Sequence, residues 1–132
     1  MDWHLIAAVL VTMAASYLLG CCNTSIVISK YVLRDDVRNH GSGNAGLTNF
    51  YRVFGKQKIL LVILADVLKT VIAVLAGAAL FHWAGNDPII GKLLGGLLCM
   101  VGHMFPFQFE FKGGKGVLAG GTMACFMGWK VA

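Results

Sequence analysis

Four apolar stretches separated by short polar segments most constrain what this chain folds into. A helix that crosses a bilayer needs about 20 mostly apolar residues. The stretches are 5–28, 59–81, 89–107 and a shorter one at 117–131. Hydrophobic residues make up 58% of the 132 positions and charged residues only 13%, which is too apolar for an ordinary soluble domain. We therefore expect residues 1–132 to form a single all-α membrane domain, a polytopic bundle of about four transmembrane helices.

The basic residues predict the orientation of this bundle. Most Lys and Arg residues lie between the first and second stretches, and Lys112 and Lys115 lie between the third and fourth. Segment 82–88, between the second and third stretches, has neither. Because basic loops stay in the cytoplasm, both basic loops are expected there, with the N-terminus outside. The net charge of +5 is then better explained by membrane orientation and an anionic lipid or substrate than by nucleic acid, and no nucleic-acid partner is expected.

The first basic loop contains a run of glycines and hydrogen-bonding side chains at 40–52. Glycine adopts backbone conformations closed to other residues, so that N–H groups can approach an anion closely. Arg52 adds a permanent cation whose planar fork suits phosphate. The residues expected to form the anion site are His40, Ser42, Gly43, Asn44, Gly46, Thr48, Asn49 and Arg52. The alternative is a turn whose Ser and Asn side chains only cap helices. The density of glycines and amides favours a site for a phosphate monoester.

The second basic loop has the composition of a phosphate cradle. Its expected binding residues are Lys112, Gly113, Gly114, Lys115 and Gly116. A Walker A loop is excluded, because Phe109 stands where that pattern needs its first glycine and Gly116 stands where it needs Ser or Thr. A nucleotide triphosphatase is therefore disfavoured. Since both loops are expected on one side of the membrane, they can converge on one site.

Three polar residues within the apolar stretches are candidates for a supporting role. Asp66 and Lys69 lie one helical turn apart, and ionisable groups at membrane depth usually face the bundle interior or a wet cavity. A helix-packing ion pair and a lining of the site both fit this pair. His103 fits a structural histidine better than a general base. The His, Cys and carboxylate residues lack metal-ligand spacing, so no metal is expected.

Taken together, these motifs resemble the two signatures of the bacterial acyl-phosphate-dependent glycerol-3-phosphate acyltransferases, the PlsY family. The first signature corresponds to His40-Gly41-Ser42-Gly43-Asn44, Gly46, Thr48-Asn49 and Arg52. The second corresponds to Gly102-His103, Phe105-Pro106 and residues 111–117. The resemblance runs from about 20 to 117, with the Asp and Lys pair in the intervening helix.

The resemblance implies an enzyme of the first step of phospholipid biosynthesis. It would transfer an acyl group from acyl-phosphate to the 1-hydroxyl of sn-glycerol 3-phosphate, giving lysophosphatidic acid and phosphate without a cofactor. Ser42 and Arg52 would be essential, Thr48 and Asn49 would help to hold phosphate, and the loop around Lys112 and Lys115 would bind a substrate phosphate. The family also implies a multi-pass protein of the bacterial inner membrane with a cytoplasmic active face.

The chain departs from the family pattern in three places. Family members are longer and carry a third cytoplasmic motif, which this sequence lacks, so we expect a C-terminally truncated member. Leu47 stands where Ala is usual, and Leu118-Ala119 replaces an Ala-Thr pair. Two alternatives to a catalytic chain stay open. One is a non-catalytic membrane binder of phosphate esters or anionic lipid. The other is a transporter component with Asp66 and Lys69 in a polar path, which the concentration of polar groups in loops disfavours.

Overall fold

The computed structural model describes residues 2–127, and every regular element in that part of the chain is helical. Short π- and 3-10-helical turns join the α-helices. The elements in order are α1 (Trp3–Cys21), α2 (Thr24–Val27), a π-helical turn (Ile28–Val32), a 3-10 turn (Val37–Asn39), α3 (Leu47–Phe54), α4 (Ile59–Trp83), α5 (Pro88–Met104), a 3-10 turn (Phe107–Phe109) and α6 (Val117–Met127).

Three helical segments are long and apolar enough to cross a membrane. They are Trp3–Val32, Ile59–Trp83 and Pro88–Phe109, and they coincide with the first three predicted spans. The fourth predicted span begins as α6, which has 11 residues in the described part of the chain. At 1.5 Å per residue α6 is about 16 Å long, roughly half of the hydrocarbon core. The membrane bundle is confirmed, whereas a fourth full span stays a prediction whose last residues, 128–131, lie outside the described part.

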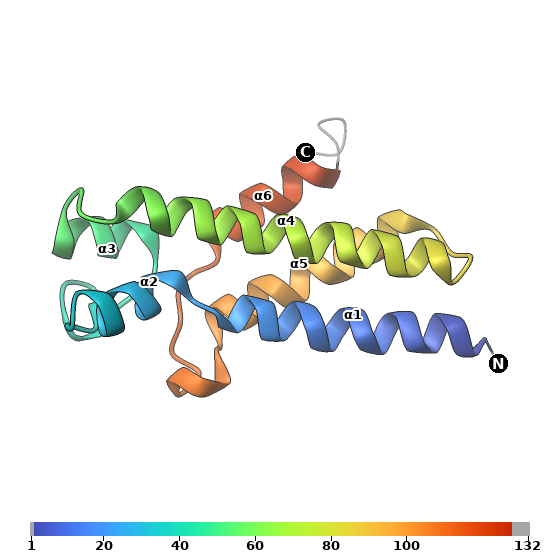
Figure 1. Ribbon diagram of the computed structural model, residues 1–132, viewed down its shortest axis with the longest axis horizontal. Coiled ribbons are helices and arrows are strands. Elements are labelled where there is room, and N and C mark those ends of the chain that lie inside the picture. The colour runs from blue at the N-terminus through green and yellow to red at the C-terminus, as the bar shows by residue number, and fades with distance from the viewer. Residues whose placement is uncertain (1, 128–132) are drawn as a thin grey trace.

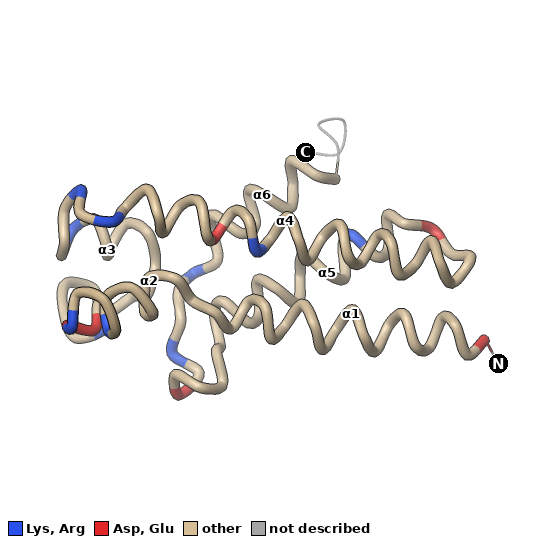
Figure 2. Tube along the Cα trace, viewed as in Figure 1, with Lys and Arg blue, Asp and Glu red and all other residues tan. Residues whose placement is uncertain are grey.

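The helices are arranged so that the polar segments gather at one end of the bundle (Figure 1). The helices α1, α4 and α5 run along the long axis of the molecule, and α6 crosses α4 and α5 at an angle. We call the end that carries α2, α3 and the segments 28–46 and 105–116 the loop end. Most of the Lys and Arg positions lie at this end, away from the N-terminus (Figure 2).

Asn23 explains why the first span is not one continuous helix. Its side chain caps α2 by accepting a hydrogen bond from the Ile26 N–H at 3.2 Å. Its amide nitrogen donates to the carbonyls of Ala45, at 3.1 Å, and His103, at 3.3 Å. The buried amide of Asn23 thus marks the break after α1 and joins it to the first basic loop and to the C-terminal end of α5.

Glycines set the distance between α4 and α5. Gly77 and Gly91 face each other so closely that a Cβ on either one would overlap the carbonyl of the other. One turn further along α5, a Cβ on Gly95 would overlap the carbonyl of Ala73. Such close backbone contact is the usual way for membrane helices to gain packing energy in the absence of a hydrophobic driving force.

Candidate active site

A cavity of about 740 Å³ lies at the loop end between α3, α4, α5 and α6. Both glycine-rich loops contribute to its wall, together with polar residues of α4 and α5 and apolar residues of α6. The lining residues are Ser42, Asn44, Gly46, Leu47, Thr48, Asn49, Arg52, Asp66, His103, Lys115, Gly116, Val117, Leu118, Gly121, Thr122 and Cys125. Residues that are far apart in the sequence therefore converge on one space.

The first loop is organised around the side chain of Asn49, which is 1% exposed. Its amide nitrogen donates to three backbone carbonyls, those of Val37, His40 and Asn44, at 3.0–3.2 Å. Two N–H bonds are shared among three acceptors, so the nitrogen has no proton left for another partner. The amide nitrogen of Asn49 therefore holds three positions of the loop backbone together.

The amide oxygen of Asn49 is equally committed. It accepts hydrogen bonds from the Ser42 N–H at 3.0 Å and from Arg52 Nη1 at 3.4 Å. The turn that brings Ser42 to this oxygen needs a positive φ at Gly41 (57°) and Gly43 (76°). The Asn49 side chain thus shapes the loop and places Ser42 and Arg52, and the phosphate contact predicted for it has no free hydrogen-bonding atom in this conformation.

Replacing Asn49 by Asp is expected to destabilise the protein by roughly 2–4 kcal/mol, since a carboxylate oxygen would face three carbonyl oxygens that now accept hydrogen bonds. Thermal unfolding in detergent measures the change. Asn39→Asp is the matched control, because Asn39 is an exposed residue of the same loop, and it should shift stability by less than about 0.5 kcal/mol. Equal effects of the two substitutions would contradict the organising role of Asn49.

Arg38 joins the two loops, a role that the sequence did not reveal. Arg38 Nη1 donates to the Phe109 carbonyl at 2.7 Å, and Arg38 Nη2 lies 2.7 Å from Asp36 Oδ2. The hydrogen bond from Arg38 holds the pKa of the Asp36 carboxyl below its usual value. Arg38 was expected only to help orient the bundle, but it also fixes the second loop beside the first.

The glycines of the second loop allow its backbone to approach α5 and the first loop. The N–H groups of Gly113 and Gly114 donate to the carbonyls of Met104 and His103 at 3.0 and 3.1 Å. A Cβ on Gly114 would come within 2.7 Å of the Ala45 carbonyl oxygen. These two glycines therefore allow the second loop to pack closely against α5 and, at Gly114, against the first loop.

The two lysines of the second loop have different surroundings. Lys115 lines the cavity. Lys112 points to the exterior, where its ammonium nitrogen is 3.8 Å from Glu110 Oε2 and its side chain is largely exposed. In this conformation Lys115 is the cation of the second loop that faces the cavity.

Ten of the predicted site residues line the cavity, and six do not. The six are His40, Gly43, Lys69, Lys112, Gly113 and Gly114. His40 is exposed, and its Nε2 is 2.7 Å from Asp35 Oδ1. Residue type alone did not distinguish the residues that line the cavity from those that do not, because the direction of each side chain depends on the backbone conformation of the loop.

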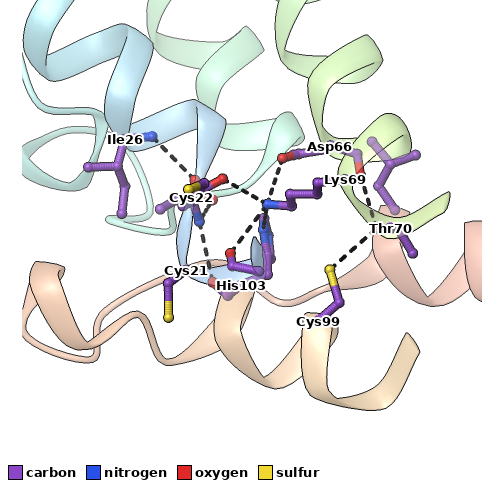
Figure 3. Close-up of polar contacts among 12 residues, drawn as sticks. Cys21, Cys22, Ile26, Asp66, Lys69, Thr70, Cys99 and His103 are labelled. Atoms are coloured by element: carbon purple, nitrogen blue, oxygen red, sulfur yellow. Dashed lines mark hydrogen bonds and ion pairs between the residues drawn. The ribbon is translucent and has the colours of Figure 1, made fainter. Parts of the chain in front are cut away.

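Lys69 is the centre of a buried polar cluster behind the cavity wall (Figure 3). Its Nζ is 3.0 Å from Asp66 Oδ1, 3.1 Å from His103 Nδ1 and 3.1 Å from the Cys22 carbonyl oxygen. The side chains of Lys69 and Asp66 are only 6% and 3% exposed. The predicted pair is therefore a buried ion pair that also joins α1 and α5, and Asp66 and His103 reach the cavity from it.

Membrane-spanning helices and a cavity lined by Arg, Lys, amide and hydroxyl groups define an integral membrane protein with a site suited to a small anionic ligand. A family model described as glycerol-3-phosphate acyltransferase matches residues 10–132, and the chain belongs to this family.

Individual relatives agree with the family match. The chain is similar to the glycerol-3-phosphate acyltransferase of Thermoanaerobacter pseudethanolicus, with 43% identity over 106 residues, which are 80% of this chain and 50% of the relative. It is also similar to that of Chlorobium luteolum, with 44% identity over 114 residues, covering 82% and 48%. The chain thus spans about half the length of the curated relatives it matches.

A solved structure has the same fold. It is the crystal structure of PlsY (YgiH), an integral membrane glycerol 3-phosphate acyltransferase, in its glycerol 3-phosphate form. The TM-score is 0.76 at 36% sequence identity, over 91% of this chain and 57% of that one. The lysophosphatidic acid form of the same protein matches with a TM-score of 0.72.

Proposed function

We propose that this chain carries the site of a membrane acyltransferase that moves an acyl group from acyl-phosphate to the 1-hydroxyl of sn-glycerol 3-phosphate. The products would be lysophosphatidic acid and inorganic phosphate. The observation that carries the proposal is the convergence of Arg52, Ser42 and Lys115 on one cavity from two separate loops. Family membership and the glycerol 3-phosphate form of the similar structure support the choice of substrate.

The proposed reaction requires the protein mainly to position its substrates and to supply positive charge. An acyl-phosphate is an activated mixed anhydride, so the protein mainly has to bring two anionic substrates together and offset their repulsion. The guanidinium of Arg52 can hold a phosphate through two parallel hydrogen bonds, and Lys115 supplies a second cation. Ser42 lines the same cavity, and its hydroxyl oxygen accepts a hydrogen bond from the Asn44 N–H at 3.3 Å. The O–H proton of Ser42 is then available to a substrate.

A second, apolar cavity supports a place for the acyl chain. It has a volume of about 430 Å³ and is lined by Leu47, Thr48, Tyr51, Ile59 and Ile63. Leu47 and Thr48 also line the main cavity, so the two spaces adjoin. An acyl chain that lay against α3 and α4 would reach the phosphate-binding groups with its activated carbonyl.

The orientation proposed for the chain places the loop end in the cytoplasm of a bacterium and the spans in its inner membrane. The concentration of Lys and Arg at the loop end supports this orientation (Figure 2). The helices α3, α4, α5 and α6 share one cavity at that end, which supports residues 1–132 acting together as one membrane domain.

The direct test is an acyl-transfer assay with purified chain, acyl-phosphate and labelled glycerol 3-phosphate. Arg52→Ala and Ser42→Ala should each lower turnover by about 100-fold or more, as loss of one group that stabilises developing charge usually does. Lys56→Ala is the control, because it removes an exposed cation of the loop end that is not part of the cavity. Turnover that survives both cavity substitutions would exclude the proposed site, and binding without turnover would favour the non-catalytic binder.

A further inference from the structure

The cavity has two chemically different sides. Arg52 of α3 and Lys115 of the second loop supply cations, whereas Asp66 of α4 and His103 of α5 supply a carboxylate and an imidazole. We infer that Asp66 and His103 form a hydroxyl-binding subsite, which makes the cavity select a phosphate ester of a polyol over other phosphate monoesters. The inference rests on the proposed function and adds to it a residue that determines specificity, Asp66.

The carboxylate of Asp66 has unused capacity to accept hydrogen bonds. It faces the cavity, and neither of its oxygens accepts a hydrogen bond from a described residue. The 3.0 Å contact with Lys69 Nζ compensates its charge, but the contact lacks hydrogen-bond geometry. A buried acceptor without a partner is rare and costly, so a ligand that donates an O–H here would be favoured. A phosphate group would be repelled by the same carboxylate.

His103 supplies a donor beside this acceptor. Its Nδ1 lies 3.1 Å from the ammonium of Lys69, which can only donate, so Nδ1 accepts and the ring proton is on Nε2. Nε2 lies against Gly114 of the second loop and makes no hydrogen bond to a described residue. A hydroxyl both donates and accepts, and it therefore suits a carboxylate and an N–H side by side.

Lys69 is a positioning residue in this arrangement. Its ammonium donates to the carbonyls of Gly20 and Cys22 and to His103 Nδ1, which leaves no proton for a phosphate. It lies behind the wall and not on it. Asp66 is seven residues into α4, about 10 Å along the helix axis from its start. The anionic end of a substrate would therefore lie at the loops and its hydroxyl end deeper, against α4 and α5.

The test compares glycerol 3-phosphate with n-propyl phosphate, which has the same phosphate but no free hydroxyl. Titration calorimetry on the purified chain in nanodiscs should give about tenfold or greater preference for glycerol 3-phosphate. In Asp66→Asn the preference should fall to about threefold or less, with the affinity for n-propyl phosphate unchanged or higher, because the carboxylate that repels phosphate is gone. Glu110→Gln makes the same chemical change at an exposed site outside the cavity and should leave the preference intact.

Three results would overturn the inference, and they are distinguishable. Equal affinities of the unaltered chain for both esters, or an equal loss of both in Asp66→Asn, would exclude a hydroxyl subsite while leaving the phosphate site in place. Failure of the unaltered chain to bind either ester would contradict the proposed function itself. If Asp66→Asn does not fold, the double variant Asp66→Leu with Lys69→Met removes both charges and should show the same loss of preference.

Discussion

Replacing Lys69 by Met is expected to destabilise the bundle by about 3–5 kcal/mol, the usual effect of leaving one partner of a buried ion pair alone. The substitution leaves the Asp66 carboxylate buried without a counter-charge. It also removes the donor to the Cys22 carbonyl and to His103 Nδ1, so three helices lose their common contact. Chemical unfolding in mixed micelles measures the change in the free energy of unfolding.

The double variant Asp66→Leu with Lys69→Met separates charge from packing. Replacing both partners by apolar residues of similar shape is often neutral or stabilising, so most of the lost stability should return. Lys92→Met is the matched single control, because Lys92 is a partly exposed lysine of α5 that contacts the Phe126 carbonyl at 3.4 Å. It should cost less than about 1 kcal/mol. A double variant no more stable than Lys69→Met would show that the charge of Asp66 is not the cause.

Replacing Gly91 by Val should separate α4 from α5 and cost about 3 kcal/mol or more. A Cβ at this position would overlap the carbonyl of Gly77, and backbone of a packed helix cannot move aside as a flexible side chain can. Because Asp66 is on α4 and His103 is on α5, glycerol 3-phosphate binding should weaken together with stability. Thermal unfolding and ligand titration of the same preparation measure both effects.

Gly121→Val provides the stability control for this substitution. A Cβ on Gly121 of α6 would meet no heavy atom within 4 Å. The same change of side chain should therefore shift stability by less than about 1 kcal/mol. If Gly91→Val were as mild as Gly121→Val, close backbone contact would not be what holds α4 against α5.

The spans were predictable because the signal for a membrane helix is local. A run of apolar residues of sufficient length decides the span wherever it lies in the fold, and three of the four predicted spans were found in place. The break in the first span was not predictable in detail, because Asn23 ends it through contacts with Ala45 and His103 that are distant in the sequence.

The sequence predicted which types of residue form the candidate site, but it did not predict which of their side chains point into the cavity. Ser42, Arg52 and Lys115 line the cavity, whereas His40 and Lys112, which have equally suitable side chains, point away from it. The amide of Asn49 looks like a ligand contact in the sequence, yet the loop uses all of its hydrogen-bonding capacity. Composition cannot distinguish a side chain that binds a ligand from one that holds the binding loop.

The sequence by itself determined the membrane class, the clustering of positive charge and the family, because apolar length, charge and motif spacing are read along the chain. Only the tertiary structure decided which polar groups share a cavity. Lys69 and His103 are 34 positions apart, and Asn23 and His103 are 80 apart. These groups meet because glycines let α4 and α5 pack with their backbones in contact, and a buried charge or amide is stable only where its partners are brought to it.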